Sequence, residues 1–290
     1  MQIGKYRLIR KLVEGEVVET FLAEAADSGR AWEVQRVLPA IRVREELVEA
    51  SLADAERASR LDHPNVQRVV DFGHVDGTLF RVMEPGGGPT LRQLIQVSTE
   101  QGAPLPPGVC AAIVGFAARG LAYVHTSLEW VHGDVKPGTV RVSREGVVKV
   151  VDFGIAKLRV HDLRTRLTPV DALAYRPPEQ FQGQAPDVSG DVYGLGMVLY
   201  ELLTGLRPFA ATDLVGTLEA IRSASYVPAV ARRPDLPEAM QRILERALAK
   251  DPAERYPDCQ SLQADLERFT LSLGEPVGLD ALARWVARVA

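Results

Sequence analysis

The sequence has little cysteine and only a small excess of negative charge. Its two cysteines, Cys110 and Cys259, are too few for a disulfide framework in 290 residues. The 34 basic and 38 acidic residues leave a net charge of −4 without a long basic run, which argues against nucleic acid as a partner. No apolar run reaches about 18 residues and the N-terminus carries no secretion signal, so we expect a cytoplasmic protein with no membrane partner.

The composition that is present, 46% hydrophobic and 25% charged residues, is typical of a globular chain. The first 83 residues alternate short apolar runs with one helical stretch near 45–60, which predicts a small sheet with a helix. The run from Glu84 to Pro89 can continue neither helix nor strand. Helical patterns follow at 107–126, 188–204, 237–249, 261–271 and 277–290. We therefore predict an α+β chain with an N-terminal lobe at 1–84, a hinge at 85–90, a helical lobe at 91–272 and a helical extension at 273–290.

Seven short motifs stand in an order that is typical of one enzyme family. The run Val131-His132-Gly133-Asp134-Val135-Lys136-Pro137 resembles the catalytic loop of protein kinases, and Asp152-Phe153-Gly154 resembles their metal-binding loop, at an interval of 152 − 134 = 18 residues. Tyr175-Arg176-Pro177-Pro178-Glu179 and the helix start at Asp191 follow, and Arg255 matches the arginine that pairs with this glutamate. With segments at 4–8 and 61–66, the motifs cover about residues 4–270. The chain resembles bacterial serine/threonine protein kinases of the Hanks type.

The resemblance implies a bilobal protein-kinase fold. Its small N-terminal lobe would contain a five-stranded antiparallel sheet and one helix, called helix C in the family, and its larger C-terminal lobe would be mainly helical. His132, Phe153 and Asp191 would be structural residues of the interior, and the pair Glu179–Arg255 would anchor the activation segment. A second Asp-Phe-Gly, at 71–73, has no catalytic loop before it, and we interpret it as an ordinary turn.

The positions that would line a nucleotide pocket depart from the family's residues. Gln35 stands where a lysine holds the ATP phosphates, and Asp54 stands where helix C carries that lysine's glutamate partner. Glu33 replaces an alanine on one face of adenine and Arg141 replaces a leucine on the other. We hypothesise that these two charges bridge and close the pocket; the alternative is that both turn to solvent. The resemblance places the degenerate pocket at Val13, Gly15, Val18, Thr20, Glu33, Gln35, Met83, Glu84, Gly86 and Arg141.

Few residues could supply the positive charge that is lost with the family's lysine at position 35. One glycine, Gly15, remains of the three in the family's phosphate loop, and the segment 13–18 is typical of a plain hairpin. Alternation along the strand points Arg36 away from Gln35. Lys5 and Lys11 are the nearest upstream lysines, and we do not expect either to replace the lost one.

Part of the catalytic machinery is retained. By resemblance Asp134 would accept a substrate hydroxyl proton, Lys136 would steady the phosphoryl group, and Asp152 could hold Mg²⁺. Three other family residues are lost, an arginine, a metal-binding asparagine and a bracing threonine, which are replaced by Gly133, Thr139 and Ala172. Loss of one preorganised contact costs about 3 kcal/mol, or about a hundredfold or more in rate. Because Gln35, Thr139 and Ala172 all depart from the family, we expect a phosphoryl-transfer rate lower by about four orders of magnitude or more.

These changes favour a pseudokinase, a binding module that keeps the kinase fold without its chemistry and needs no cofactor. Its partner would be a protein, such as an active kinase, the substrate of that kinase, or a phosphopeptide-binding domain that recognises phosphorylated Thr165 or Thr168. The alternative is a slow or unconventional serine/threonine kinase that uses Asp134 and Asp152 with Mg-ATP and a borrowed cation. The two hypotheses differ in whether the protein binds ATP with magnesium.

Overall fold

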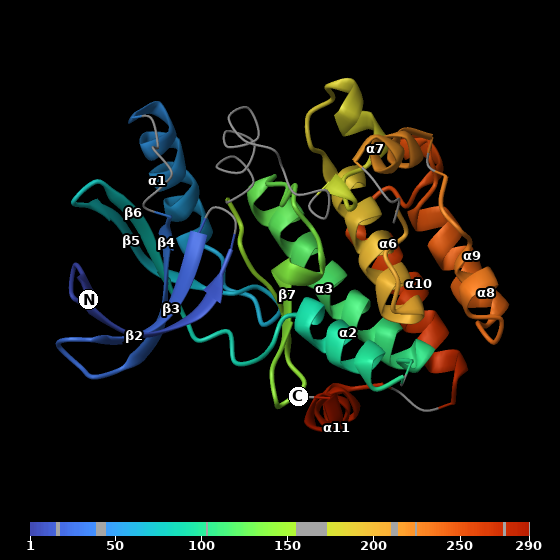
Figure 1. Cartoon of the computed structure of the whole chain (residues 1–290), viewed down its shortest axis with the longest axis horizontal. Coiled ribbons are helices and arrows are strands. Elements are labelled where there is room, and N and C mark those ends of the chain that lie inside the picture. The colour runs from blue at the N-terminus through green and yellow to red at the C-terminus, as the bar shows by residue number, and fades with distance from the viewer. Residues whose placement is uncertain are drawn as a thin grey trace. The chain divides into compact units, whose positions relative to one another are not determined.

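The computed structural model describes residues 1–15, 18–38, 45–102, 104–154, 173–209, 214–223, 225–274 and 277–289 (Figure 1). Contacts between residues divide the chain into two compact units. The first comprises 1–86 together with 152–154, and the second comprises 87–151 with the described residues from 173 onward. The change of unit after Gly86 falls inside the glycine- and proline-rich linker predicted at 85–90.

The first unit is built on one antiparallel sheet (Figure 1). Its strands are β1 (Gln2–Ile3), β2 (Tyr6–Glu14), β3 (Val18–Ala25), β4 (Ala31–Val37), β5 (Val69–Val75) and β6 (Thr78–Met83), in the order β1-β2-β3-β4-β6-β5. The resemblance predicted five strands, and the additional one is β1, which pairs with the start of β2. The turn between them contains Gly4 at φ +53°, a conformation that glycine adopts without steric cost.

Helix α1 (Glu45–Ser59) covers one face of this sheet. Its Leu47, Val48 and Leu52 pack against a small core of Val18, Val37 and Leu79. A second core, which includes Val34 and Val82, lies on the other face, because successive side chains of a strand point to opposite sides. The face under α1 is therefore the face of residues 35 and 81.

The second Asp-Phe-Gly copy is not a turn, and that interpretation was wrong. Residues 71–73 lie within β5, and their Cα atoms pair with those of 80–82 in β6. Asp71 accepts a hydrogen bond from the Tyr6 hydroxyl at 2.7 Å and lies 3.3 Å from Lys5 Nζ. A Cβ at Gly73 would lie 3.1 Å from the Phe80 ring, so the glycine leaves room for a cross-strand aromatic residue.

The described residues of the segment 13–18 belong to the β2–β3 hairpin, as predicted. Glu14 stands opposite Glu19, and the Gly15 N–H donates to the Val18 carbonyl at 2.9 Å. A Cβ at Gly15 would lie 2.8 Å from that oxygen. The retained glycine is thus explained by close backbone approach in a hairpin.

The second unit is mainly helical. It contains α2 (Leu91–Glu100), α3 (Pro107–Leu128), α6 (Val188–Thr204), α7 (Leu214–Ser223), α8 (Ala229–Arg232), α9 (Glu238–Ala247), α10 (Cys259–Ser272) and α11 (Leu279–Val289), with 3-10 turns at Pro137–Thr139, Pro178–Gln182 and Pro252–Glu254, and the hairpin of β7 (Val140–Val142) and β8 (Val148–Val150). Each predicted helical stretch is present within two residues of its predicted bounds. Helix α2 was not predicted, although Thr90 and Gln93 form a capping box at its start.

Helix α3 is the centre of this unit and packs against α6 and α10. By length and composition alone it could cross a membrane, but 72% of its most apolar window is buried inside the protein. Such burial is what a core helix shows.

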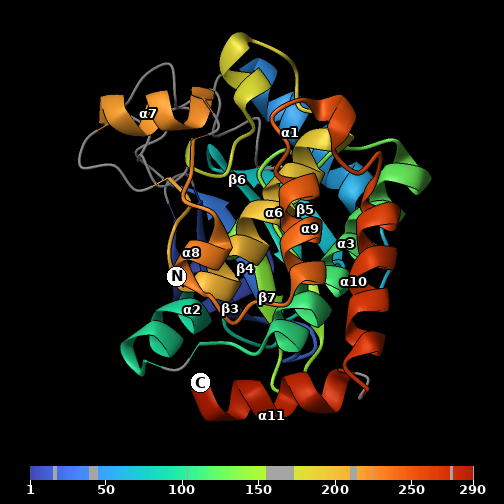
Figure 2. The same ribbon diagram turned by 90° about the vertical axis from the view of Figure 1, so that its right-hand side faces the viewer.

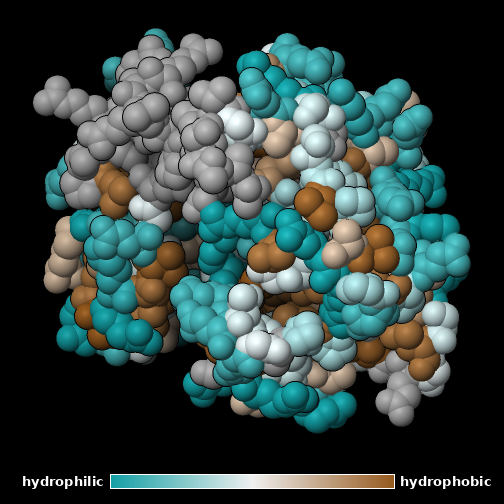
Figure 3. Space-filling model, turned by 45° about the vertical axis from the view of Figure 1, so that its right-hand side comes forward, coloured by the Kyte–Doolittle hydropathy of each residue, from teal (hydrophilic) through white to brown (hydrophobic). Residues whose placement is uncertain are grey.

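Apolar residues remain on the surface of the second unit. Figure 3 shows hydrophobic residues interspersed with hydrophilic ones on the face in view. At and just before α8 the exposed large apolar side chains are Val227 and Val230, beside a cavity of about 260 Å³ walled by Tyr200 and Tyr226. Scattered apolar exposure is ordinary for folded proteins, so this surface alone identifies no partner.

Helix α11 lies beside α2 (Figure 2) and its position depends on a glycine in the β7–β8 loop. Gly146 has φ +81°, and a Cβ there would lie 2.1 Å from the Leu279 carbonyl at the start of α11.

We expect Gly146→Ala to lower the free energy of unfolding by about 2–4 kcal/mol, measured by guanidinium denaturation. The matched control is Gly183→Ala at φ +88°, where a Cβ meets no atom within 4 Å and only the backbone cost of about 1–2 kcal/mol applies. Equal losses in the two variants would contradict the clash.

Candidate functional site

Two neighbouring strands bring Gln35 and Arg81 together in the first unit. Strands β4 and β6 are antiparallel, and the Cα atoms of Gln35 and Arg81 are direct partners, so their side chains share one face. Both side chains are buried, and Arg81 is 7% exposed. Arg36 faces the other side, as predicted, where its guanidinium lies 2.6 Å from Glu19.

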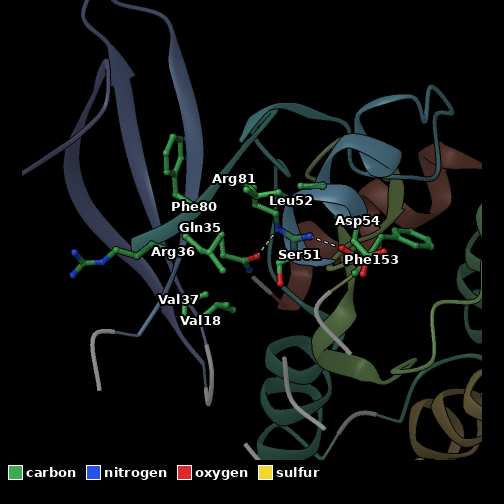
Figure 4. A pocket seen from close by; sticks show the side chains of 13 residues that line it. Val18, Gln35, Arg36, Val37, Ser51, Leu52, Asp54, Phe80, Arg81 and Phe153 are labelled. Carbon is green, nitrogen blue, oxygen red and sulfur yellow. Dashed lines mark hydrogen bonds between the residues drawn. The ribbon is translucent and has the colours of Figure 1, made fainter. Parts of the chain in front are cut away.

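The guanidinium of Arg81 donates to three oxygens. Its Nε donates to Oε1 of Gln35 at 2.6 Å and its Nη1 to the backbone oxygen of Phe153 at 2.5 Å (Figure 4). Its Nη2 donates to Oδ1 of Asp152 at 2.9 Å. The Gln35 amide completes the set, because its Nε2 donates to the same Asp152 oxygen at 2.9 Å. A buried arginine thus neutralises the aspartate that was predicted as a possible magnesium ligand.

Arg81 was not predicted as a functional residue. It stands in the run Leu79-Phe80-Arg81-Val82-Met83. A single cation inside an apolar strand is the signal that could have identified it, because arginine is almost never buried unless it is paired.

Neither upstream lysine supplies a charge to this site. Lys11 Nζ lies 2.7 Å from a carboxylate oxygen of Glu19, and this hydrogen bond, followed by one to Glu14, raises the pKa of Lys11. Lys5 is paired with Asp71 at the other end of β2. The expectation that neither lysine replaces the lost one agrees with these contacts.

A cavity of about 40 Å³ lies against the Arg81 cluster, within the first unit. Asp54 of α1 lines it together with Gln35, Arg81 and the buried Phe153 (Figure 4). Position 54 therefore faces position 35, as the resemblance implies, but an aspartate and an amide replace the glutamate and lysine. This space is far smaller than the roughly 300–1,000 Å³ of a typical ligand pocket.

A second set of hydrogen bonds occupies the backbone of residues 84–86, which the resemblance places at the adenine edge of the pocket. Glu33 Oε1 accepts from the Gly86 N–H at 2.9 Å. Gln67 Nε2 donates to the Glu84 carbonyl at 3.0 Å and to Glu33 Oε2 at 3.1 Å. Glu33 and Gln67 are only 4% and 5% exposed, so the arrangement is shielded from water.

These two side chains imitate the hydrogen-bonding edge of adenine. Adenine presents its exocyclic amine, a donor, beside a ring nitrogen, an acceptor. The Gln67 amide donates to the Glu84 carbonyl as such an amine would, and the Glu33 carboxylate accepts from the Gly86 N–H as such a ring nitrogen would. Gln67 was not predicted. Its signal is a polar residue directly after the apolar Val66, in a segment that leads into β5.

The hypothesised bridge between Glu33 and Arg141 would join the two units and stays a prediction. The alternative, that both side chains turn to solvent, is wrong for Glu33, which is buried and hydrogen-bonded. Arg141 is partly buried, and its Nε donates to the Gly88 carbonyl at 2.9 Å.

The remaining predicted pocket residues differ in burial. Val18, Thr20 and Met83 are buried, whereas Val13 is 39% exposed. Thr20 Oγ1 lies 3.4 Å from Gln35 Nε2, so the amide has a second, weaker partner beside Asp152.

The predicted catalytic residues lie in the second unit. Lys136 Nζ lies 3.2 Å from Asp134 Oδ2, and both side chains are largely buried. The hydroxyl of Thr139 donates to the Asp134 backbone oxygen at 3.1 Å and accepts from the Lys136 N–H at 3.1 Å. Thr139 therefore closes the 3-10 turn that follows the catalytic loop, and its oxygen is engaged with the backbone.

Asp191 holds the same loop from α6. Its carboxylate accepts from the backbone N–H groups of His132 and Gly133 at 2.8 Å each, and His125 Nε2 lies 2.8 Å from Oδ2. His132 Nε2 lies 2.8 Å from the Val151 carbonyl. Gly133 has φ +72°, which a glycine adopts more readily than the arginine it replaces. The contacts of His132 and Asp191 are those of structural residues.

The predicted pair Glu179–Arg255 is present. Two guanidinium nitrogens of Arg255 donate to the two Glu179 oxygens at 2.6 and 2.9 Å, and the side chains are 0% and 8% exposed. Arg255 also donates to the Ala249 carbonyl at 2.7 Å and lies 4.7 Å from the Tyr193 ring centroid. A bidentate, desolvated pair of this kind fixes the two segments that it joins.

Three predicted residues, Ala172, Thr165 and Thr168, lie outside the described residues, so their roles stay predictions. Within the ranges that the structure describes, no group of three or more His, Cys, Asp or Glu side chains is arranged to hold a metal ion.

Comparison with known proteins identifies the family. The protein kinase domain family matches residues 6–266. Tyrosine-protein kinase MasK of Myxococcus xanthus is 33% identical over 277 residues, which cover 92% of this chain and 43% of that protein. Serine/threonine-protein kinase PrkC of Bacillus subtilis is 31% identical over 265 residues, which cover 91% of this chain and 40% of that protein. The crystal structure of the Mycobacterium tuberculosis PknI kinase domain has a TM-score of 0.72 at 27% identity and covers 92% of this chain and 97% of that one.

This chain thus spans about two fifths of the length of these two curated relatives. It belongs to the protein kinase domain family, with bacterial serine/threonine kinases among its relatives.

Proposed function

We propose that this chain is a pseudokinase that acts as a protein-binding scaffold or allosteric regulator in bacterial serine/threonine kinase signalling, with ATP binding impaired or absent. The observation that carries the proposal is the placement of Glu33 and Gln67 on the backbone of residues 84–86. These side chains occupy the hydrogen-bonding groups that an adenine ring would use.

Adenine could reach those groups only by displacing both side chains. Each buried polar group left without a partner costs about 1–3 kcal/mol, and a charged group costs more. Gln35 carries no positive charge for the phosphates, and Arg81 already holds the Asp152 oxygen that a magnesium ion would need. Mg-ATP therefore does not fit the residues of this site.

A kinase fold without a nucleotide can act only through its surface. The proposed partner is a protein in the cytoplasm, such as an active kinase, the substrate of that kinase or a phosphopeptide-binding domain. The near balance of charge, 34 basic against 38 acidic residues, gives no support to nucleic acid or an anionic membrane as the partner.

Thermal unfolding tests the proposal directly. We expect the unfolding midpoint to be the same with and without millimolar ATP and Mg²⁺, because neither the adenine nor the metal finds its groups available. A ligand at 100 times its dissociation constant would add about 2.7 kcal/mol, or roughly 5–10 °C for a domain of this size. An active kinase domain measured in parallel is the positive control. A magnesium-dependent shift in the unaltered protein would contradict the proposal.

The alternative, a slow kinase, is favoured by the retained ion pair of Asp134 and Lys136 at 3.2 Å. It requires the magnesium-dependent shift together with transfer of radiolabelled phosphate to a protein substrate. That transfer should disappear in Asp134→Asn.

A further inference from the structure

Arg81 is a buried cation of the first unit, and each of its hydrogen bonds has a defined acceptor. It enters from β6 on the face covered by α1, and its three donors point at Gln35, Asp152 and the Phe153 carbonyl. Arg81 and Asp152 side chains are 9% and 15% exposed. An ion pair so shielded from water is screened little by salt.

The Gln35 amide is matched to this cation. Its oxygen accepts from Arg81, and its nitrogen donates to the Asp152 oxygen that Arg81 also contacts. A lysine at position 35 would present an ammonium group to the guanidinium and would offer no acceptor to Arg81 Nε. The loss of the family's lysine and the arginine at 81 are therefore two parts of one arrangement.

The Asp-Phe-Gly turn is the segment that this arrangement holds. Asp152 has φ +70°, a sparsely populated conformation for a residue other than glycine. Arg81 grips the turn at two consecutive residues, through the side chain of Asp152 and the backbone of Phe153. A strained backbone of this kind persists only where its surroundings determine it.

We propose that Arg81 is a positioning residue that takes the place of the metal ion at Asp152 and holds the Asp-Phe-Gly turn in one conformation without any ligand. This inference deepens the proposed function and rests on it for the absence of nucleotide. The chain would then keep this turn in the same conformation when it meets its partner, and magnesium would not alter that conformation.

A double-mutant cycle on unfolding without nucleotide tests the proposal. Arg81→Leu removes the guanidinium that pairs with the largely buried Asp152 carboxylate and should lower the thermal midpoint by about 10 °C. Asp152→Asn should lower it by a similar amount. In the double variant the second substitution should add little, because neither charge is then left unpaired. If Arg81→Leu alone does not fold, recovery of folded protein in the double variant is the same result.

The matched control uses Arg36, which follows Gln35 on β4 and faces the other side of the sheet. Arg36→Leu combined with Asp152→Asn should lower the midpoint by the sum of the two single effects to within about 2 °C, because Arg36 bonds Glu19 on the face of the sheet opposite to Gln35 and Arg81. Arg68→Leu, at an exposed position before β5, should leave the midpoint unchanged. Additive effects of Arg81→Leu and Asp152→Asn would overturn the proposal.

Hydrogen exchange gives a readout that general destabilisation does not move. In Arg81→Leu, amides of residues 148–154 should exchange faster than in the unaltered protein while those of β2 and β3 keep their protection. Uniform loss of protection across the first unit would also overturn the proposal. Neither experiment contains nucleotide. The proposed role of Arg81 can therefore be overturned while the ATP titration still supports the proposed function, and the proposed function can be overturned while the role of Arg81 holds.

Discussion

Replacing Arg255 with methionine is expected to lower the free energy of unfolding by about 3–5 kcal/mol. The substitution leaves the Glu179 carboxylate buried opposite an apolar side chain, after loss of both hydrogen bonds at 2.6 and 2.9 Å. It also removes the donor to the Ala249 carbonyl. Guanidinium denaturation followed by circular dichroism measures the change, and the slope with denaturant shows whether the two-state description still holds.

The matched control is Arg242→Met on α9. Arg242 pairs with Glu238 one helical turn away, but the side chains are 63% and 83% exposed, so the change should stay within about 0.5 kcal/mol. The double variant Arg255→Met/Glu179→Leu should recover part of the loss, because replacing both members of a buried pair with apolar residues removes the unpaired charge. A loss below about 1 kcal/mol in Arg255→Met would show that water reaches Glu179 and that the pair does not anchor the segment.

Opening the nucleotide site should create ATP binding that we do not expect of the unaltered protein. The variant Glu33→Ala/Gln67→Val frees the Gly86 N–H and the Glu84 carbonyl and replaces two buried polar side chains with apolar ones. Adding Gln35→Lys and Arg81→Val supplies a cation for the phosphates and releases Asp152. We expect the fourfold variant to gain about 2.7 kcal/mol of stability at ATP concentrations 100 times its dissociation constant.

Magnesium dependence of ATP binding distinguishes the pair Glu33→Ala/Gln67→Val from the pair Gln35→Lys/Arg81→Val. Glu33→Ala/Gln67→Val alone should bind ATP weakly and equally with or without Mg²⁺, because Arg81 still holds Asp152. Only the fourfold variant should show a shift that needs the metal. Glu24→Ala, on the same sheet but paired with Arg7 at the surface, is the control and should gain no binding. A folded fourfold variant that ignores ATP would show that these four residues do not close the site.

Order matters among these substitutions. Gln35→Lys by itself would place an ammonium group beside the Arg81 guanidinium, since the two residues are direct partners across β4 and β6. Restoring the family's lysine is therefore useful only after Arg81 is changed.

The fold and the positions of several site residues were predicted from motifs that are local in the sequence. The interval between Asp134 and Asp152, the Pro-Pro-Glu run and the apolar helical patterns predicted a helical unit, and the structure places Asp191 and Glu179 as those motifs imply. Strand alternation predicted that Gln35 and Arg36 point to opposite faces. The turn assigned to 71–73 was wrong, because a Gly after an extended run also occurs inside a strand where a cross-strand aromatic residue needs room.

By itself, the sequence determined that a kinase fold forms and that the lysine at position 35 and the alanine at position 33 are gone. Only the tertiary structure decided what replaces them. Gln35 meets Arg81 from 46 residues away and Asp152 from 117 residues away, and Glu33 meets Gln67 from 34 residues away. Strand register and burial set such meetings, because a buried charge or amide must find partners wherever the fold brings them, and no local pattern encodes those partners.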